Sequence, residues 1–102
     1  MAPIDNGTRF SETATHATAA VASHAAVAGK TYYITDIAVS SDKAGAICLV
    51  KQGTTTILQL QIGASFFSHS FVVPLKGATG ALVSVEIDGT SACKANIIGF
   101  EL

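Results

Sequence analysis

The apolar residues of this chain fall in short alternating runs that glycines and Asp-Gly turns interrupt. The clearest run is Leu82–Asp88, in which Val83, Val85 and Ile87 alternate with polar residues. An alternation with a period of two places one set of side chains on one face of a β-strand, so that one face is buried and the other is solvated. We therefore expect an all-β protein.

Other segments have the same character and are separated by turn-forming residues. The predicted strands are Thr31–Ser40, Ala46–Lys51, Thr55–Ile62, Phe66–Leu75 and Cys93–Leu102. Pro74 lacks an N–H donor, which favours an edge position or a strand end for the segment that contains it. Asp88-Gly89 predicts a hairpin or a close connection between the last two strands.

The segment from Glu12 to Ala28 is ambiguous, because its alanines favour a helix. Its threonines and valines, and the lack of charge pairs that an exposed helix uses, favour a strand, which we expect. Counted this way, seven or eight strands recur at intervals of about 8 to 12 residues, which predicts a β-sandwich or barrel. We assign residues 12–102 to this single domain and residues 1–11 to an N-terminal arm, which is either a frayed terminus or a clasp on a partner.

The surface of such a domain is poor in charge. Only 13% of the 102 residues are charged, 49% are hydrophobic, and the mean hydropathy is +0.48. Because soluble domains carry about a quarter charged residues, we expect part of the surface to be covered by another protein. The last predicted strand has apolar residues on both faces, so we expect the subunit interface to be concentrated in Cys93–Leu102.

Several classes of function are disfavoured. A net charge of -1 with scattered Lys and Arg argues against direct nucleic-acid binding. The first ten residues lack the apolar stretch of a signal peptide or membrane helix, so we expect synthesis in a cytoplasm. Cys48 and Cys93 lie far apart among apolar neighbours, which favours buried free thiols over a disulfide, a metal site or a redox pair. We expect no metal and no cofactor.

No catalytic motif is found, and we expect the protein not to be an enzyme. Gly29-Lys30-Thr31 copies the end of a phosphate-binding loop, but His24 stands where the loop needs its first glycine. His16 and His24 would lie roughly 26 Å apart on one continuous strand, too far for a shared metal ion. A carbohydrate-binding role for Tyr32 and Tyr33 remains an alternative, weakened by the absence of tryptophan.

The chain from about residue 14 onward resembles small jelly-roll proteins that are common among the virion components of tailed bacteriophages. The likeness begins with Ala26-Val27-Ala28-Gly29-Lys30 and the strand from Tyr32 to Ser41. It continues through the turn at 42–45, the segment Ile47-Cys48-Leu49-Val50-Lys51-Gln52-Gly53, and the closing strands at 82–87 and 97–100. The arm before Glu12 lies outside it.

This resemblance implies an antiparallel β-sandwich with jelly-roll topology and a trimeric capsid decoration, or cement, protein on the virion surface. The implied partners are further copies of the chain and the major capsid protein, with no membrane and no nucleic acid. The alternative is a head-fibre, tail-fibre or receptor-binding module, glycan binding included; a soluble enzyme ranks third. The candidate contact residues are Ile4, Asp5, Arg9, Phe10, Ile98 and Phe100.

Overall fold

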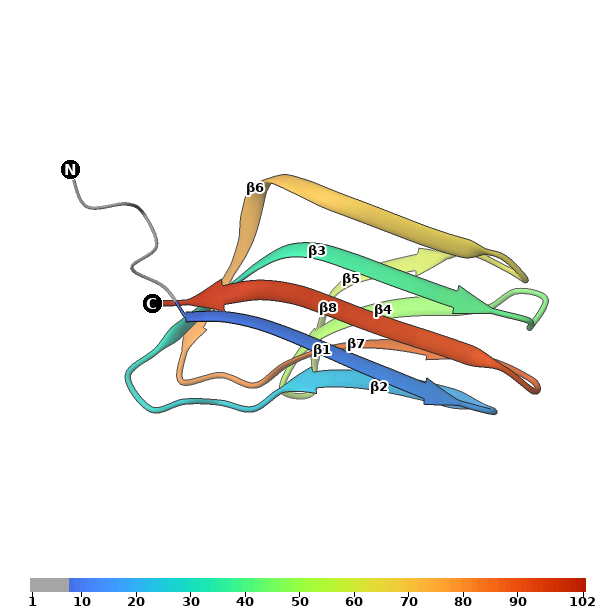
Figure 1. Cartoon of the computed structure of the whole chain (residues 1–102), viewed down its shortest axis with the longest axis horizontal. Helices are drawn as coiled ribbons and strands as arrows, with labels where there is room; N and C mark the ends of the chain where they lie inside the picture. The colour runs from blue at the N-terminus through green and yellow to red at the C-terminus, as the bar shows by residue number, and fades with distance from the viewer. Residues whose placement is uncertain (1–7) are drawn as a thin grey trace.

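The computed structural model describes residues 8–102, which form two four-stranded antiparallel sheets packed face to face (Figure 1). The strands are β1 Thr8–His16, β2 Ala19–His24, β3 Thr31–Ser41, β4 Ile47–Gln52, β5 Thr55–Gln61, β6 Phe66–Thr79, β7 Val83–Asp88 and β8 Cys93–Glu101. Nothing within residues 8–102 forms a helix with the length and apolarity that a membrane crossing requires. The predicted all-β sandwich is confirmed.

The strand order is that of a jelly roll. Sheet I has the order β1-β8-β3-β6 and sheet II the order β2-β7-β4-β5. The chain is one long folded hairpin, whose two arms pair as β4·β5, β3·β6, β2·β7 and β1·β8. Two further pairs, β3·β8 and β4·β7, complete the two sheets. Gly53 at the centre of this hairpin, between β4 and β5, has a φ of 60°, a backbone conformation that glycine adopts without strain.

Alternation along the strands builds the core between the sheets. Its largest fully buried side chains include Ile34, Ile37 and Ile97 from sheet I. Val50 and Ile87 face them from sheet II. On β8, Cys93, Ala95, Ile97 and Gly99 are buried while Lys94 and Ile98 are exposed, which is the period of two expected of a sheet with one wet face.

The N-terminal half differs from the sequence prediction in two respects. The expected single strand over 12–28 is two strands in different sheets, because the chain turns at Ala17-Thr18. Nδ1 of His16 accepts the backbone N–H groups of Thr18 and Ala19, at 3.1 and 3.2 Å, and so stabilises this turn. In addition, β1 starts at Thr8, so residues 8–11, which we expected in the arm, lie in sheet I.

The C-terminal half differs at one connection. β7 and β8 lie in different sheets, so Asp88-Gly89 opens a link across the sandwich, and the predicted alternative of a hairpin is wrong. The position predicted from Pro74 is confirmed, because β6 is the edge strand of sheet I.

Candidate interaction surface

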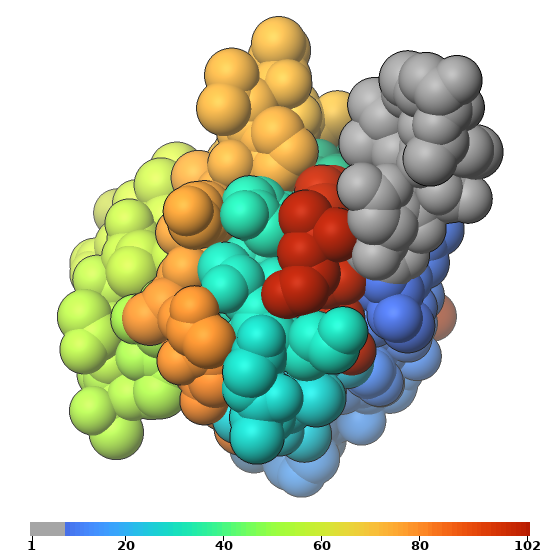
Figure 2. Space-filling model, turned by 90° about the vertical axis from the view of Figure 1, so that its left-hand side faces the viewer, coloured from blue at the N-terminus to red at the C-terminus, as the bar shows by residue number. Residues whose placement is uncertain are grey.

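The most exposed apolar side chains lie on the edge strand β6. Ser70 of β6 pairs with Asp36 and Leu75 with Ile34, so residues 71–74 stand opposite Thr35 alone and bulge away from β3. Val72 and Val73 in this β6 bulge are 99% and 79% exposed. Figure 2 shows this part of β6 as a knob that projects from the body of the molecule. A bulge of this kind re-aims side chains and ends strand pairing.

An apolar groove lies beside the bulge, between the edge strands of the two sheets. Its volume is about 190 Å³, and its lining residues are Ile37, Leu58, Leu60, Phe67, His69 and Phe71. The His69 ring stacks on Phe67, with ring centroids 6.2 Å apart, and meets Phe71 edge-on at 4.7 Å. The sandwich is therefore open along the β5–β6 side, the side formed by these two edge strands.

The β5–β6 side is also poor in charge, with Lys76 of β6 lying beyond the bulge. No Asp, Glu, Lys or Arg occurs between Lys51 and Lys76, a stretch that contains all of β5 and most of β6. Sequence reasoning placed the surplus of apolar surface on Cys93–Leu102, but that strand, β8, is central in sheet I and buries one of its faces. The run without charged residues from 52 to 75 is the sequence signal that could have identified this more exposed surface.

A second surface is the outer face of sheet I, where three of the predicted contact residues meet. Arg9 pairs with Phe100 across β1 and β8, and Ile98 is one alternation further along β8, 38% exposed. The Phe100 ring stacks on Tyr33 of β3 with ring centroids 5.0 Å apart. This strip combines one cation, an aromatic pair and an aliphatic side chain, a composition typical of protein contacts.

Phe10, by contrast, is a core residue. Its side chain is 7% exposed and stacks on the His24 ring, with ring centroids 4.0 Å apart. A Cβ at Gly99 would overlap the backbone oxygen of Tyr33 and crowd the Phe10 ring, so this packing requires glycine there. Phe10 is therefore not available to a partner while the chain is folded. Ile4 and Asp5 lie outside the described residues.

His24 joins the two sheets beside Phe10. Its Nδ1 lies 3.2 Å from Glu12 Oε2 on β1, and its Nε2 lies 3.1 Å from Glu101 Oε2 on β8. A neutral imidazole carries one N–H, so only the protonated ring donates to both carboxylates. The carboxylates occupy opposite ring nitrogens instead of converging on one point, and within residues 8–102 no cluster of His, Cys, Asp or Glu is arranged to hold a metal ion.

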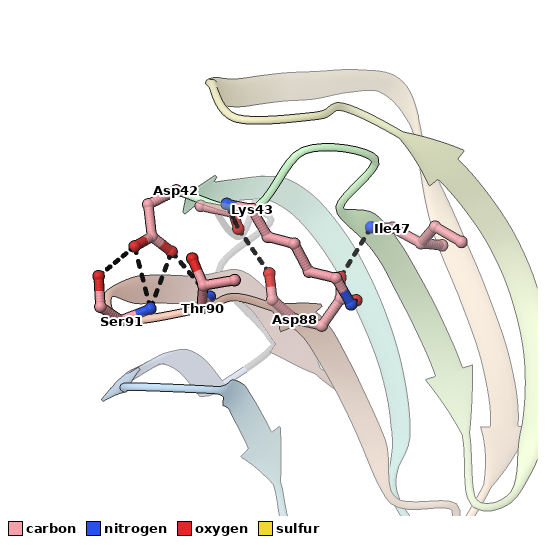
Figure 3. Close-up of polar contacts among 7 residues, drawn as sticks. Asp42, Lys43, Ile47, Asp88, Thr90 and Ser91 are labelled. Atoms are coloured by element: carbon pink, nitrogen blue, oxygen red, sulfur yellow. Dashed lines mark hydrogen bonds and ion pairs between the residues drawn. The ribbon is translucent and has the colours of Figure 1, made fainter.

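Two aspartates fasten the loops at the end of the sandwich opposite the start of β1 (Figure 3). The carboxylate of Asp42 accepts the backbone N–H groups of Thr90 and Ser91 and the Ser91 hydroxyl. Asp88 accepts Lys43 Nζ at 2.6 Å and the N–H of Ile47 at 2.8 Å. Hydrogen bonds from Ser91 and Thr90 hold the pKa of Asp42 well below its usual range, and the Lys43 bond lowers that of Asp88.

One tyrosine and both cysteines, which could have carried binding or redox chemistry, are instead buried in the core. Tyr32 is buried, and its hydroxyl donates to Gln52 Oε1 at 2.7 Å, so this side chain is not available for sugar stacking. Both cysteines are buried free thiols, as predicted. Burial raises the pKa of Cys48 to about 11, which disfavours the reactive thiolate.

The molecule thus presents a charge-poor β5–β6 side and, on the outer face of sheet I, a surface of mixed chemistry. Comparison with known proteins adds no assignment, since no family model and no curated protein matches this chain.

Proposed function

We propose that this protein is a structural component of a bacteriophage virion, namely a capsid decoration protein that binds the outer capsid as a homotrimer and stabilises it. The proposal rests on the resemblance to jelly-roll virion proteins together with the kind of surface that the chain exposes. It places the protein on the capsid surface and gives it no catalytic role.

The observation that carries the proposal is that the chain exposes two contact surfaces of different chemistry on different parts of one sandwich. A decoration protein needs one surface for its own copies and another for the capsid. The outer face of sheet I, with Arg9, Ile98 and Phe100, suits the capsid, because it mixes charge with aromatic and aliphatic groups. It also carries β1, the strand into which the N-terminal residues lead.

The frame behind these surfaces suits a part that must hold its shape. Within the described residues, no buried side-chain nitrogen or oxygen lacks a hydrogen-bond partner. The loops that Asp42 and Asp88 join are held by ionised groups, whose hydrogen bonds are stronger than neutral ones. A preorganised surface loses less entropy on binding than a flexible one, which favours tight attachment.

The test is to mix the protein with cognate expanded capsids and to measure co-sedimentation and the capsid melting temperature. We expect binding and a higher melting temperature. Ile98→Asp, on the outer face of sheet I, should weaken binding at least tenfold, because it places a charge in the proposed contact. The matched control is Val21→Asp, which changes a comparably exposed valine on β2 in sheet II, 46% exposed against 38% for Ile98, and should bind like the wild type. Failure to bind capsids, with binding to host cells or glycans instead, would favour the fibre or receptor-binding alternative.

A further inference from the structure

We infer that copies of this chain associate through the β5–β6 side, with Val72 and Val73 of one copy seated in the groove between β5 and β6 of the next. This inference names the self-contact of the proposed decoration protein and rests on that function only for the number of copies, three. Its own basis is the exposure, shape and charge of the β5–β6 side.

The exposed area is large for a surface that stays in water. Phe66 is 79% exposed, Val72 99%, Val73 79% and Ile57 43%. Phe66 stands opposite Ser40, earlier on β6, and Ile57 alternates with Leu58, which lines the groove, so these two expose their surface away from the bulge. Val72 and Val73, which are adjacent in the bulge, expose on the order of 250 Å² between them, about a third of the roughly 800 Å² that each partner buries in a standard interface. The groove residues next to them add further apolar surface. The two valines and the groove therefore supply the apolar centre of a contact between copies.

The shapes on this side are complementary to one another. The β6 bulge is a projection that ends in two valines, and the groove is an apolar hollow of about 190 Å³. An apolar cavity of about 150 Å³ holds a benzene molecule, so the groove has room for one or two valine side chains. Because one chain carries both the projection and the hollow, each copy can give one contact and receive another, as in a closed ring.

The pattern of charge favours a copy of the same chain as the partner. Proteins that must not self-associate place lysines, other charges or covering loops at their edge strands. β1, at the opposite edge of sheet I, carries Arg9, Glu12 and His16, whereas the segment from 52 to 75 carries no Asp, Glu, Lys or Arg. A pair of edges with so little charge offers little repulsion to an identical pair. Pro74 and the bulge interrupt the β6 ladder, so side-chain packing dominates this contact over continuous strand pairing.

The first experiment measures the mass of the protein in solution by light scattering after gel filtration. We expect the wild type to be oligomeric, a trimer under the proposed function, and the double variant Val72→Asp/Val73→Asp to be monomeric. The double variant should still fold, because both valines are exposed in the single chain. We therefore expect it to show a cooperative melting transition and the circular dichroism spectrum of the wild type. Val21→Asp is the matched control and should keep the wild-type mass.

The second experiment tests the same contact by disulfide cross-linking, without the aspartates that the first experiment introduces. The single variants Val72→Cys and Leu60→Cys are mixed under oxidising conditions, and we expect a disulfide between copies that joins the two introduced cysteines. The native cysteines, Cys48 and Cys93, are buried and do not compete. Val21→Cys mixed with Leu60→Cys is the control pair and should not cross-link.

A monomeric wild type, or an aspartate double variant with the wild-type mass and no disulfide between Val72→Cys and Leu60→Cys, would overturn the inference. Its failure is distinguishable from failure of the proposed function. A monomer that binds capsids keeps the decoration role but rejects both the self-contact and the trimer. An oligomer that is held by the β5–β6 side but does not bind capsids supports the self-contact and rejects the decoration role.

Discussion

The sandwich has two long sides, each formed by one edge strand of either sheet: the β1–β2 side and the β5–β6 side. On the first, side chains of the chain itself fill the space between the sheets, and on the second they leave a groove. On the β1–β2 side, Phe10 and His24 fill the gap between the sheets, and Glu12 and Glu101 bond to the His24 ring. On the β5–β6 side the gap remains as a groove, and the β6 bulge turns two valines outward. The comparison indicates that the number of apolar residues alone does not predict an exposed apolar surface. Apolar side chains stay exposed only where no other part of the chain packs against them.

The largest expected difference between the two sides comes from removing one phenylalanine ring from each. Phe10→Ala should lower the free energy of unfolding by about 3–5 kcal/mol, because the ring is buried and its loss leaves a cavity. Phe66→Ala removes a 79% exposed ring and should change the stability of the isolated monomer by less than about 0.5 kcal/mol. Urea unfolding in the monomeric Val72→Asp/Val73→Asp background measures both values. Equal losses would contradict the distinction between a closed and an open side.

The next effect tests whether polar contacts also hold the β1–β2 side together. His24→Ala should cost about 1–3 kcal/mol, because Glu101, whose side chain is only 13% exposed, loses its partner. Ser23→Ala, at the exposed neighbouring position on β2, is the control and should be nearly neutral. A double-mutant cycle of His24→Ala with Glu101→Gln measures the coupling between the two side chains. A coupling near zero would show that the ring matters only by stacking on Phe10.

A smaller effect concerns local opening, which should occur first on the open side. Cys48 lies on β4 beside the edge strand β5, and Cys93 lies on β8 beside the edge strand β1. Because β5 borders the open groove, whereas β1 is held to β2 through Phe10, Glu12 and His24, we expect β5 to open at a lower free energy than β1. With the variants Cys93→Ala and Cys48→Ala, a thiol reagent should therefore modify Cys48 several times faster than Cys93. Local opening exposes the thiol to water, so the pKa that burial raises in Cys48 does not apply in the opened state. Mass spectrometry of timed samples gives both rates. Faster modification of Cys93 would place the weaker side at β1–β2.

The smallest effect concerns the loops that join the sides at one end. The pKa of Asp42 is lowered in the folded chain, so the folded state binds fewer protons than the unfolded state at mildly acid pH. The stability that Asp42 contributes is present above the unfolded pKa of about 4 and is lost as the pH falls below it. Asp42→Asn should therefore lower the melting temperature by a few degrees at pH 7 and by less at acid pH. Parallel melting curves from pH 7 to pH 2 would contradict this role.

The sequence predicted the sandwich because its evidence is local. Val83, Val85 and Ile87 alternate over a single strand, and all three are buried on one face of β7. Pro74 predicted an edge strand from the chemistry of one residue, and β6 is at the edge. The β6 bulge was not predictable in this way, because it depends on residues 71–74 facing only Thr35 of a strand that lies far away in the sequence.

The candidate surfaces were predicted only in part for the same reason. Arg9, Ile98 and Phe100 lie together on one outer face because β1 and β8, the first and last strands, pair with each other. Phe10 follows Arg9 directly, but the alternation of β1 points it into the core, once the strand is known to start at Thr8. The boundary between arm and strand therefore decided which of the neighbouring residues was available for contact.

By itself, the sequence determined that this chain forms short β-strands with one apolar face each, since alternation and turn chemistry act between residues that are close along the chain. The tertiary structure decided which apolar residues stay exposed. Ile97 and Val72 are equally apolar in the sequence, but Ile97 lies on a central strand under the opposite sheet, while Val72 lies in a bulge at an edge. Exposure depends on which distant strands become neighbours, and that pairing arises only when the whole hairpin closes into two sheets.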